Sequence, residues 1–148
     1  VDSLGSWTDF VGDEYKAFSG TAVYTTTINK VPVADVIKLD LGSVAENASV
    51  YLNGDYIGTV IDSPYQLYIP AEKFKGQDEL VVRVANSMAN RIAYMDKKGV
   101  DWKIFYNVNM SARKKEKVKN GIFDASDWEP KSSGLLGPVT LTPAMVKQ

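Results

Sequence analysis

The feature that constrains the fold most is the pair Asn53-Gly54, which lies between two runs of alternating apolar residues within 48–61. A two-residue type I′ turn needs a positive φ at both central positions, and Asn and Gly reach that region at the lowest cost. The backbone twist of this turn also matches the twist of two antiparallel strands. The pattern therefore predicts a β-hairpin over residues 48–61 and an antiparallel sheet around it.

Other segments also alternate between apolar and polar residues with a period of two, which is typical of half-buried strands. They cover 20–29, 37–41, 65–69, 79–86 and 135–142, and we expect one helical turn near 71–74 and a short helix within 87–96. Turns at intervals of roughly 8–12 residues favour a sandwich over alternating strands and helices. We expect an all-β fold, an antiparallel jelly-roll β-sandwich of roughly eight strands. Trp7 should pack in its core or at a strand edge, and Pro138 should mark an edge or a bulge.

The chain of 148 residues fits one domain, 1–148. The alternating pattern weakens after Ser87 and returns near Leu135, so we expect a long loop insertion over about 87–134 in that domain. One strand is expected through 102–108. Compact domains usually keep such a long connection only where it has a function.

The composition excludes several classes of site. The chain has no Cys and no His, so it forms no disulfide, no Cys/His zinc site and no Ser-His-Asp triad. A formal net charge of −1 argues against nucleic acid as a partner. No apolar run approaches the ~20 residues of a transmembrane helix, so we expect no membrane insertion.

Three blocks of sequence carry a resemblance to a known family. They are Phe-Ser-Gly-Thr-Ala-Val-Tyr at 18–24, a middle block from Leu-Asp-Leu-Gly at 39–42 to Leu-Val-Val-Arg-Val-Ala-Asn at 80–86, and Ser-Gly-Leu-Leu-Gly-Pro-Val at 133–139. Together they resemble the galactose-binding-like jelly-roll domain, or sugar-binding domain, of family 2 glycoside hydrolases. With Asn90-Arg91-Ile92 after the strand, the pattern is most similar to the C-terminal sandwich of family 106 α-L-rhamnosidases. The resemblance covers most of residues 5–143 and is weakest over 93–130.

This resemblance implies a non-catalytic module of a bacterial glycoside hydrolase. Such a module supports the catalytic domain and contacts the glycan substrate, and the resemblance places it in the periplasm or outside the cell. The catalytic carboxylates of these enzymes usually lie on a separate (β/α)₈ barrel, which needs about 250 residues. We therefore expect no enzyme activity in this chain. A free-standing carbohydrate-binding module and a small glycosidase with its own carboxylate pair are the alternatives.

Candidate sugar-binding residues cluster in and before the long connection. Aromatic rings there could stack on sugar faces or could pin the loop onto the sandwich. Arg and Asn side chains could donate to sugar hydroxyls, or Arg91 could tie a loop to backbone carbonyls. The candidates are Trp102, Trp128, Tyr106, Asn90, Arg91 and Asp127, with Phe105 as a weaker one.

Carboxylates are also frequent in this region, at Asp96, Asp101, Asp124 and Glu129 besides Asp127. A glycosidase needs two carboxylates ~5–10 Å apart, a separation that the sequence does not define. We expect no cofactor. These carboxylates could also hold a structural Ca²⁺, which galactose-binding-like sandwiches often carry, although no Asp-x-Asp-x-Asp-Gly run is present. The basic run 113–119 is typical of a solvated hairpin tip before an Asn120-Gly121 turn, with an acidic polysaccharide or a nucleic acid as the alternative partner.

Overall fold

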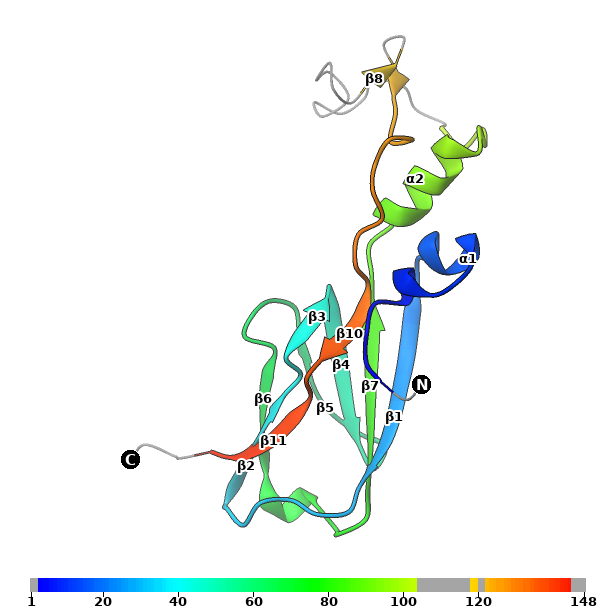
Figure 1. The fold of residues 1–148 in the computed structure, drawn as a ribbon. Helices are drawn as coiled ribbons and strands as arrows, with labels where there is room; N and C mark the ends of the chain where they lie inside the picture. Colours follow the sequence, from blue (N-terminus) through cyan, green and yellow to red (C-terminus); the bar gives the residue numbers. More distant parts are fainter. Residues whose placement is uncertain (1–2, 104–117, 120–121, 145–148) are drawn as a thin grey trace. The chain divides into compact units, whose positions relative to one another are not determined.

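The computed structural model describes residues 3–103, 118–119 and 122–144 (Figure 1). These residues form two compact units, and each unit is built from segments that are not continuous in the sequence. Unit 1 comprises Val1–Trp7, Gly20–Asn86 and Ser132–Gln148, and unit 2 comprises Thr8–Ser19 and Ser87–Lys131. Most of the expected insertion at 87–134 thus falls in unit 2, and the assignment of 1–148 to one domain stays a prediction.

The described residues form helices and strands that are labelled in chain order. They are η1 (Trp7–Asp9), α1 (Asp13–Lys16), β1 (Thr21–Ile28), β2 (Val36–Asp40), β3 (Ser43–Ala45), β4 (Asn47–Leu52), β5 (Asp55–Val60), β6 (Gln66–Pro70), η2 (Ala71–Lys73), β7 (Asp78–Ala85), α2 (Ala89–Lys97), β8 (Val118–Lys119), β9 (Ile122–Phe123), β10 (Gly134–Gly137) and β11 (Thr140–Pro143).

Unit 1 is an antiparallel β-sandwich (Figure 1). One layer is a sheet with the strand order β1-β7-β4-β5, and the other contains the sheets β11-β2-β6 and β10-β3. The all-β sandwich predicted from the alternating segments is therefore confirmed. The register between β10 and β3 shifts between Leu135 and Gly137, directly before Pro138, and β11 lies at an edge of its sheet. Pro138 itself lies between β10 and β11, so its assignment to an edge or a bulge stays a prediction.

The core of unit 1 follows from the period of two along its strands. Residues alternate between buried and partly exposed along β2, β4 and β7, because successive side chains point to opposite faces of a sheet. Trp7 is buried, as predicted. The buried cluster consists of Ile28, Leu39, Leu41, Val44, Ala48, Val50, Leu52, Val60, Ile69, Leu80, Val82, Val84 and Leu135.

The Asn-Gly hairpin is formed by β4 and β5 and is tied to the next strand of its sheet. Asn53 and Gly54 have φ values of 52° and 86°, as the type I′ prediction requires. The backbone N–H of Asn53 donates to the carbonyl of Glu79 at 2.8 Å, and the Asn53 Oδ1 accepts the N–H of Glu79 at 3.0 Å. The Asn53 Nδ2 donates to Asp78 Oδ1 at 2.7 Å. One turn residue therefore fixes where β7 begins beside β4.

Asp78 is a buried carboxylate with a full set of donors. It is 1% exposed and accepts hydrogen bonds from Asn53, from the N–H of Lys75 at 2.8 Å and from the N–H of Gly76 at 3.0 Å. Burial by itself would raise the pKa of this carboxyl. The three hydrogen bonds and the nearby charge of Lys75 outweigh it, so the pKa of Asp78 lies below its ordinary value.

The chain leaves unit 1 twice and returns to it twice. Residues at these four places are hydrogen-bonded to one another. The N–H of Trp7 donates to the carbonyl of Ser133 at 3.0 Å. The N–H of Gly20 donates to Asn86 Oδ1 at 3.0 Å, and the N–H of Asn86 donates to the carbonyl of Gly20 at 3.2 Å. The Asn86 Nδ2 donates to Ser133 Oγ at 3.2 Å. These bonds form a clamp at one end of β1 and β7.

Unit 2 contains the helices α1 and α2 and the short pair β8-β9. The predicted short helix within 87–96 is observed as α2. Val118 pairs with Phe123 and Lys119 with Ile122, so β8 and β9 flank the predicted Asn120-Gly121 turn, which lies outside the described residues. Most of the basic run 113–119 and of the predicted strand 102–108 also lies outside them. Within the described ranges, no helix has the length and apolar character that crossing a membrane requires.

The Asp78 carboxylate makes the stability of unit 1 dependent on pH. Because the pKa of Asp78 is lower in the folded state, its contribution is complete above the unfolded value of about 3.9 and is lost as the pH falls through the folded value. At pH 7 we expect Asp78→Asn to lower the free energy of unfolding by about 3 kcal/mol. The difference from the unchanged chain should shrink as the pH is lowered below about 4. Urea denaturation at several pH values measures both effects.

The matched control is Asp55→Asn, because Asp55 is exposed and lies in the same hairpin. It should change the free energy of unfolding by less than about 0.5 kcal/mol. A difference between Asp78→Asn and the unchanged chain that stays constant from pH 7 to pH 3 would contradict the prediction.

Candidate functional site

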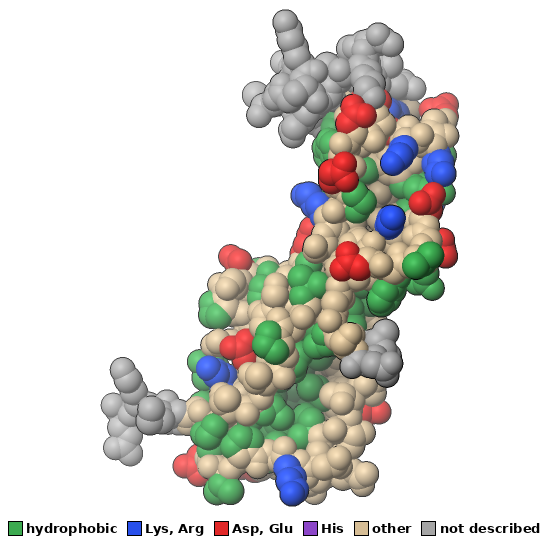
Figure 2. All heavy atoms as spheres, viewed as in Figure 1, with side chains coloured by type: hydrophobic (Ala, Val, Ile, Leu, Met, Phe, Trp, Pro, Cys, Tyr) green, Lys and Arg blue, Asp and Glu red, His purple; other side chains and the backbone are tan. Residues whose placement is uncertain are grey.

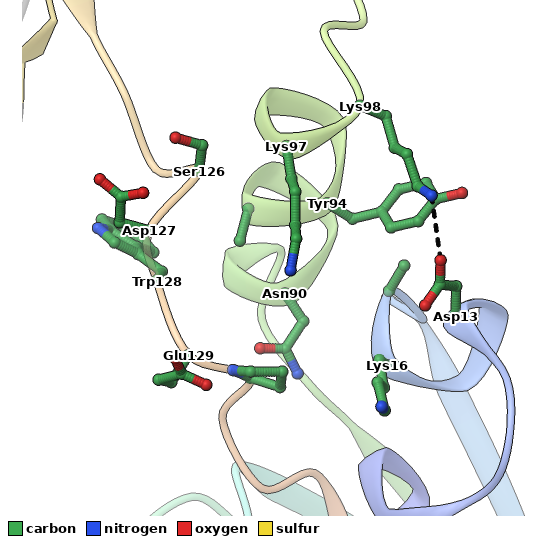
Figure 3. Close-up of a pocket in the computed structure, with 13 residues that line it drawn as sticks. Asp13, Lys16, Asn90, Tyr94, Lys97, Lys98, Ser126, Asp127, Trp128 and Glu129 are labelled. Atoms are coloured by element: carbon green, nitrogen blue, oxygen red, sulfur yellow. Dashed lines mark ion pairs between the residues drawn. The ribbon is translucent and has the colours of Figure 1, made fainter.

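A cavity of about 460 Å³ lies entirely within unit 2, and we call it the α1–α2 cavity. Three segments build it: helix α1, one face of helix α2 and the loop 126–130 (Figure 3). This volume falls within the usual range of small-ligand sites. The lining residues are Asp13, Lys16, Ala17, Asn90, Ala93, Tyr94, Lys97, Lys98, Ser126, Asp127, Trp128, Glu129 and Pro130.

The structure brings three of the six sequence candidates to this cavity, namely Asn90, Asp127 and Trp128. Trp102 and Arg91 are not among the residues that line it. Tyr106 lies outside the described residues, as does Phe105. The assignment of these six residues to sugar binding stays a prediction.

Asn90 holds the segment that closes the cavity. It is 5% exposed, its Nδ2 donates to the carbonyl of Lys131 at 2.8 Å, and its Oδ1 accepts the N–H of Lys131 at 2.8 Å. This pair of bonds imitates the pairing of two strands, so the side chain fixes the end of the loop to α2. Asn90 therefore has a clear structural role at the floor of the site.

Trp128 is the exposed aromatic residue of the cavity. The residue is 37% exposed, and Phe123 contacts its ring edge-on, with the ring centroids 5.8 Å apart and the planes at 88°. The N–H of Trp128 donates to the carbonyl of Ala125 at 3.0 Å. Asp124 caps the turn before it by accepting the N–H of Ser126 at 2.9 Å. The indole is thus held in place while part of it stays open to a ligand.

Trp102, by contrast, belongs to a buried network around Asp96. The Trp102 Nε1 donates to Asp96 Oδ1 at 2.7 Å, and Lys103 forms an ion pair with the same oxygen at 2.7 Å. The N–H of Ala125 donates to Asp96 Oδ2 at 2.8 Å. The side chain of Asp96 is 1% exposed. Within unit 2 the network joins Trp102 to α2 and to the segment at Ala125. The alternative that the ring pins the loop onto the sandwich stays a prediction.

Several residues of the cavity were not singled out from the sequence. Tyr94 and Lys97 extend from α2, and Lys16 extends from α1. On α2 a signal exists, because residues 90, 94 and 97 recur at the spacing of one helix face. Lys16 belongs to a helix of four residues, which has too few positions to show any period.

The charges of the cavity are mixed. Lys98 forms an ion pair with Asp13 at 3.2 Å, drawn as the dashed line in Figure 3, and its ammonium also lies 5.5 Å from the centre of the Tyr94 ring. Arg91 lies 5.9 Å from the centre of the same ring, is exposed and does not line the cavity. The described residues contain no group of three or more acidic side chains that could hold a metal ion. The cavity is suited to binding a polar ligand with an apolar face.

Unit 1 carries a separate apolar groove of about 590 Å³ between its two edge strands β1 and β11. We call it the β1–β11 groove. Figure 2 shows hydrophobic side chains gathered in this hollow of the sandwich. Core residues reach its floor. It is lined by Leu4, Val23, Tyr24, Thr25, Thr26, Thr27, Ile28, Leu80, Val82, Leu135, Val139 and Leu141.

The Asp96 network predicts how Trp102 contributes. Trp102→Phe removes one donor from a buried carboxylate, so we expect unit 2 to lose about 1–2 kcal/mol of stability. Amide hydrogen exchange along α2 measures this loss as faster exchange. Trp128→Phe is the matched control, because the Trp128 indole is partly exposed, and it should leave exchange in α2 unchanged. Equal protection of α2 in both variants would disprove the structural role of Trp102.

No protein-family model matches the chain. A protein of Formosa agariphila named "Putative beta-glucuronidase" is 34% identical over 95% of this chain, which spans 13% of that protein. The solved structure of a rhamnosidase from Novosphingobium sp. PP1Y matches 95% of this chain and 12% of its own, with a TM-score of 0.75 and 28% identity. The chain therefore spans about an eighth of the length of these larger relatives. The predicted likeness is confirmed: this chain is a small β-sandwich module of the kind that glycoside hydrolases contain.

Proposed function

We propose that the chain is a non-catalytic module of a bacterial glycoside hydrolase that degrades polysaccharide. It packs against the catalytic domain of that enzyme and contacts the glycan through the α1–α2 cavity. Its rhamnosidase likeness makes pectic and rhamnose-rich glycans the first substrates to test. The same likeness is the basis for placing it in the periplasm or outside the cell.

The β1–β11 groove is the observation that carries the supporting role. An apolar groove between two edge strands leaves backbone donors and acceptors and core side chains open to water, which sandwiches usually avoid. A neighbouring domain that covers it would satisfy both. The relatives supply such neighbours, because about seven-eighths of their length lies outside the match.

The α1–α2 cavity favours a second function, that of a free-standing carbohydrate-binding module. A ring held against Phe123 and a cavity with several polar side chains match the usual recognition of a pyranose, whose apolar face stacks on an aromatic ring. The two functions differ at the groove. A free-standing module has no partner for it, so the groove should then be closed in solution and should not take up an apolar dye.

The first test measures catalysis and binding on the chain itself. We expect no hydrolysis of 4-nitrophenyl α-L-rhamnoside or β-D-glucuronide, because the chain is expected to lack a catalytic carboxylate pair. In affinity electrophoresis against pectic and rhamnose-rich polysaccharides, we expect one glycan class to retard the chain. Trp128→Ala should abolish this retardation with an unchanged melting temperature, which shows that the variant is folded.

Two outcomes would overturn parts of the proposal. Hydrolysis that disappears in Asp127→Asn or Glu129→Gln would show a small glycosidase instead of an accessory module. An absence of retardation across the whole panel would remove the glycan contact.

A further inference from the structure

We infer that the α1–α2 cavity selects an acidic glycan, in which a sugar carboxylate faces Lys97 and Lys16 while the sugar ring lies against Trp128. This inference rests on the proposed glycan contact and adds the chemical class of the ligand. It depends on which charges of the cavity are already paired and on where the remaining ones point.

Six charged side chains line the cavity, three of each sign. Lys98 and Asp13 neutralise one another at 3.2 Å, so they offer little to a ligand. Among the described residues, neither Lys16 nor Lys97 forms an ion pair. Both lysines are exposed, and each lies at the last position of its helix. Neither ammonium group is neutralised by a carboxylate of the described residues, so both can face a ligand.

Apart from Asp13, which is paired with Lys98, the acidic and basic side chains of the cavity lie on different sides (Figure 3). Lys97 runs along α2 with its ammonium towards Asn90, inside the ring of lining side chains. Asp127 comes from the opposite loop, and its carboxylate is turned away from α2. Glu129 is the other acidic side chain that the loop contributes to the lining of the cavity. The helix side therefore presents cations to a ligand that enters between α2 and the loop.

The remaining parts of the cavity are fixed before a ligand arrives. Asn90 is locked to the backbone of Lys131, and Trp128 is held by Phe123 and by its backbone bond to Ala125. A rigid platform lowers the entropy that binding costs. Hydrogen bonds between an ammonium and a carboxylate are stronger than those between an ammonium and a hydroxyl. A sugar that stacks on Trp128 and carries a carboxylate thus gains more here than its neutral counterpart.

The test compares ligands that differ only in the charge of the carboxyl group. The probes are polygalacturonate and hyaluronate, each beside its methyl-esterified form, in affinity electrophoresis of the whole chain. We expect the free acids to retard the chain more than the esters, and we expect 0.5 M NaCl to weaken this retardation. Lys97→Gln should lower the affinity for the free acid roughly tenfold. Glu129→Gln should raise it, because it removes the anion that remains on the loop.

Lys73→Gln is the matched control, because Lys73 is an exposed lysine of η2 in unit 1. It should leave the affinity unchanged. A melting curve of Lys97→Gln that overlays that of the unchanged chain shows that the variant is folded. Should the variant prove unfolded, the opposite shift expected for Glu129→Gln still tests the inference.

The outcomes separate the inference from the function on which it rests. Equal retardation by free acids and esters, abolished in both cases by Trp128→Ala, would overturn the acidic selection and leave the glycan contact standing. Affinity for free acids that falls equally in Lys97→Gln and Lys73→Gln would place the charge effect outside the cavity and would also overturn the inference. No retardation by any of the four probes would overturn the acidic selection, while retardation by neutral rhamnose-rich glycans would preserve the proposed function.

Discussion

The sandwich depends on one buried carboxylate. Asp78 accepts hydrogen bonds from the hairpin residue Asn53 and from the two backbone N–H groups that precede β7. A charge can stay in such a place only when donors surround it, so the hairpin, the loop at 75–76 and the start of β7 must all arrive together. The register between β4 and β7 is fixed by the same atoms, and with it the face on which every apolar side chain of these strands lies.

Unit 2 also contains a buried carboxylate that is surrounded by donors. Asp96 is buried, and it joins α2 to Trp102 and Lys103 on one side and to Ala125 on the other. The bonds of Asp96 do not involve Lys97 or Trp128, which line the α1–α2 cavity.

The sequence predicted the sandwich well because its signals are local. A positive φ at Asn53 and the alternation through β2, β4 and β7 are visible within ten residues of chain. The cavity could be predicted only in part, since its lining comes from three segments that are distant in sequence. Trp102 and Trp128 look alike in the sequence, and only the burial of Asp96 distinguishes the ring that supports the fold from the ring that faces solvent. Tyr94 shares a helix face with Asn90 and Lys97, whereas Lys16 lies on a helix too short to show any period.

The clamp formed by Trp7, Gly20, Asn86 and Ser133 has a consequence for how such a module can diversify. Both excursions of the chain, 8–19 and 87–131, leave and return through residues that the sandwich itself holds together. Closing a longer loop between fixed ends adds only about 0.6 kcal/mol per doubling of its length. Mutation, insertion or exchange within the excursions therefore leaves the folding of the host nearly untouched, and new ligand specificities can be sampled on a scaffold that does not have to change.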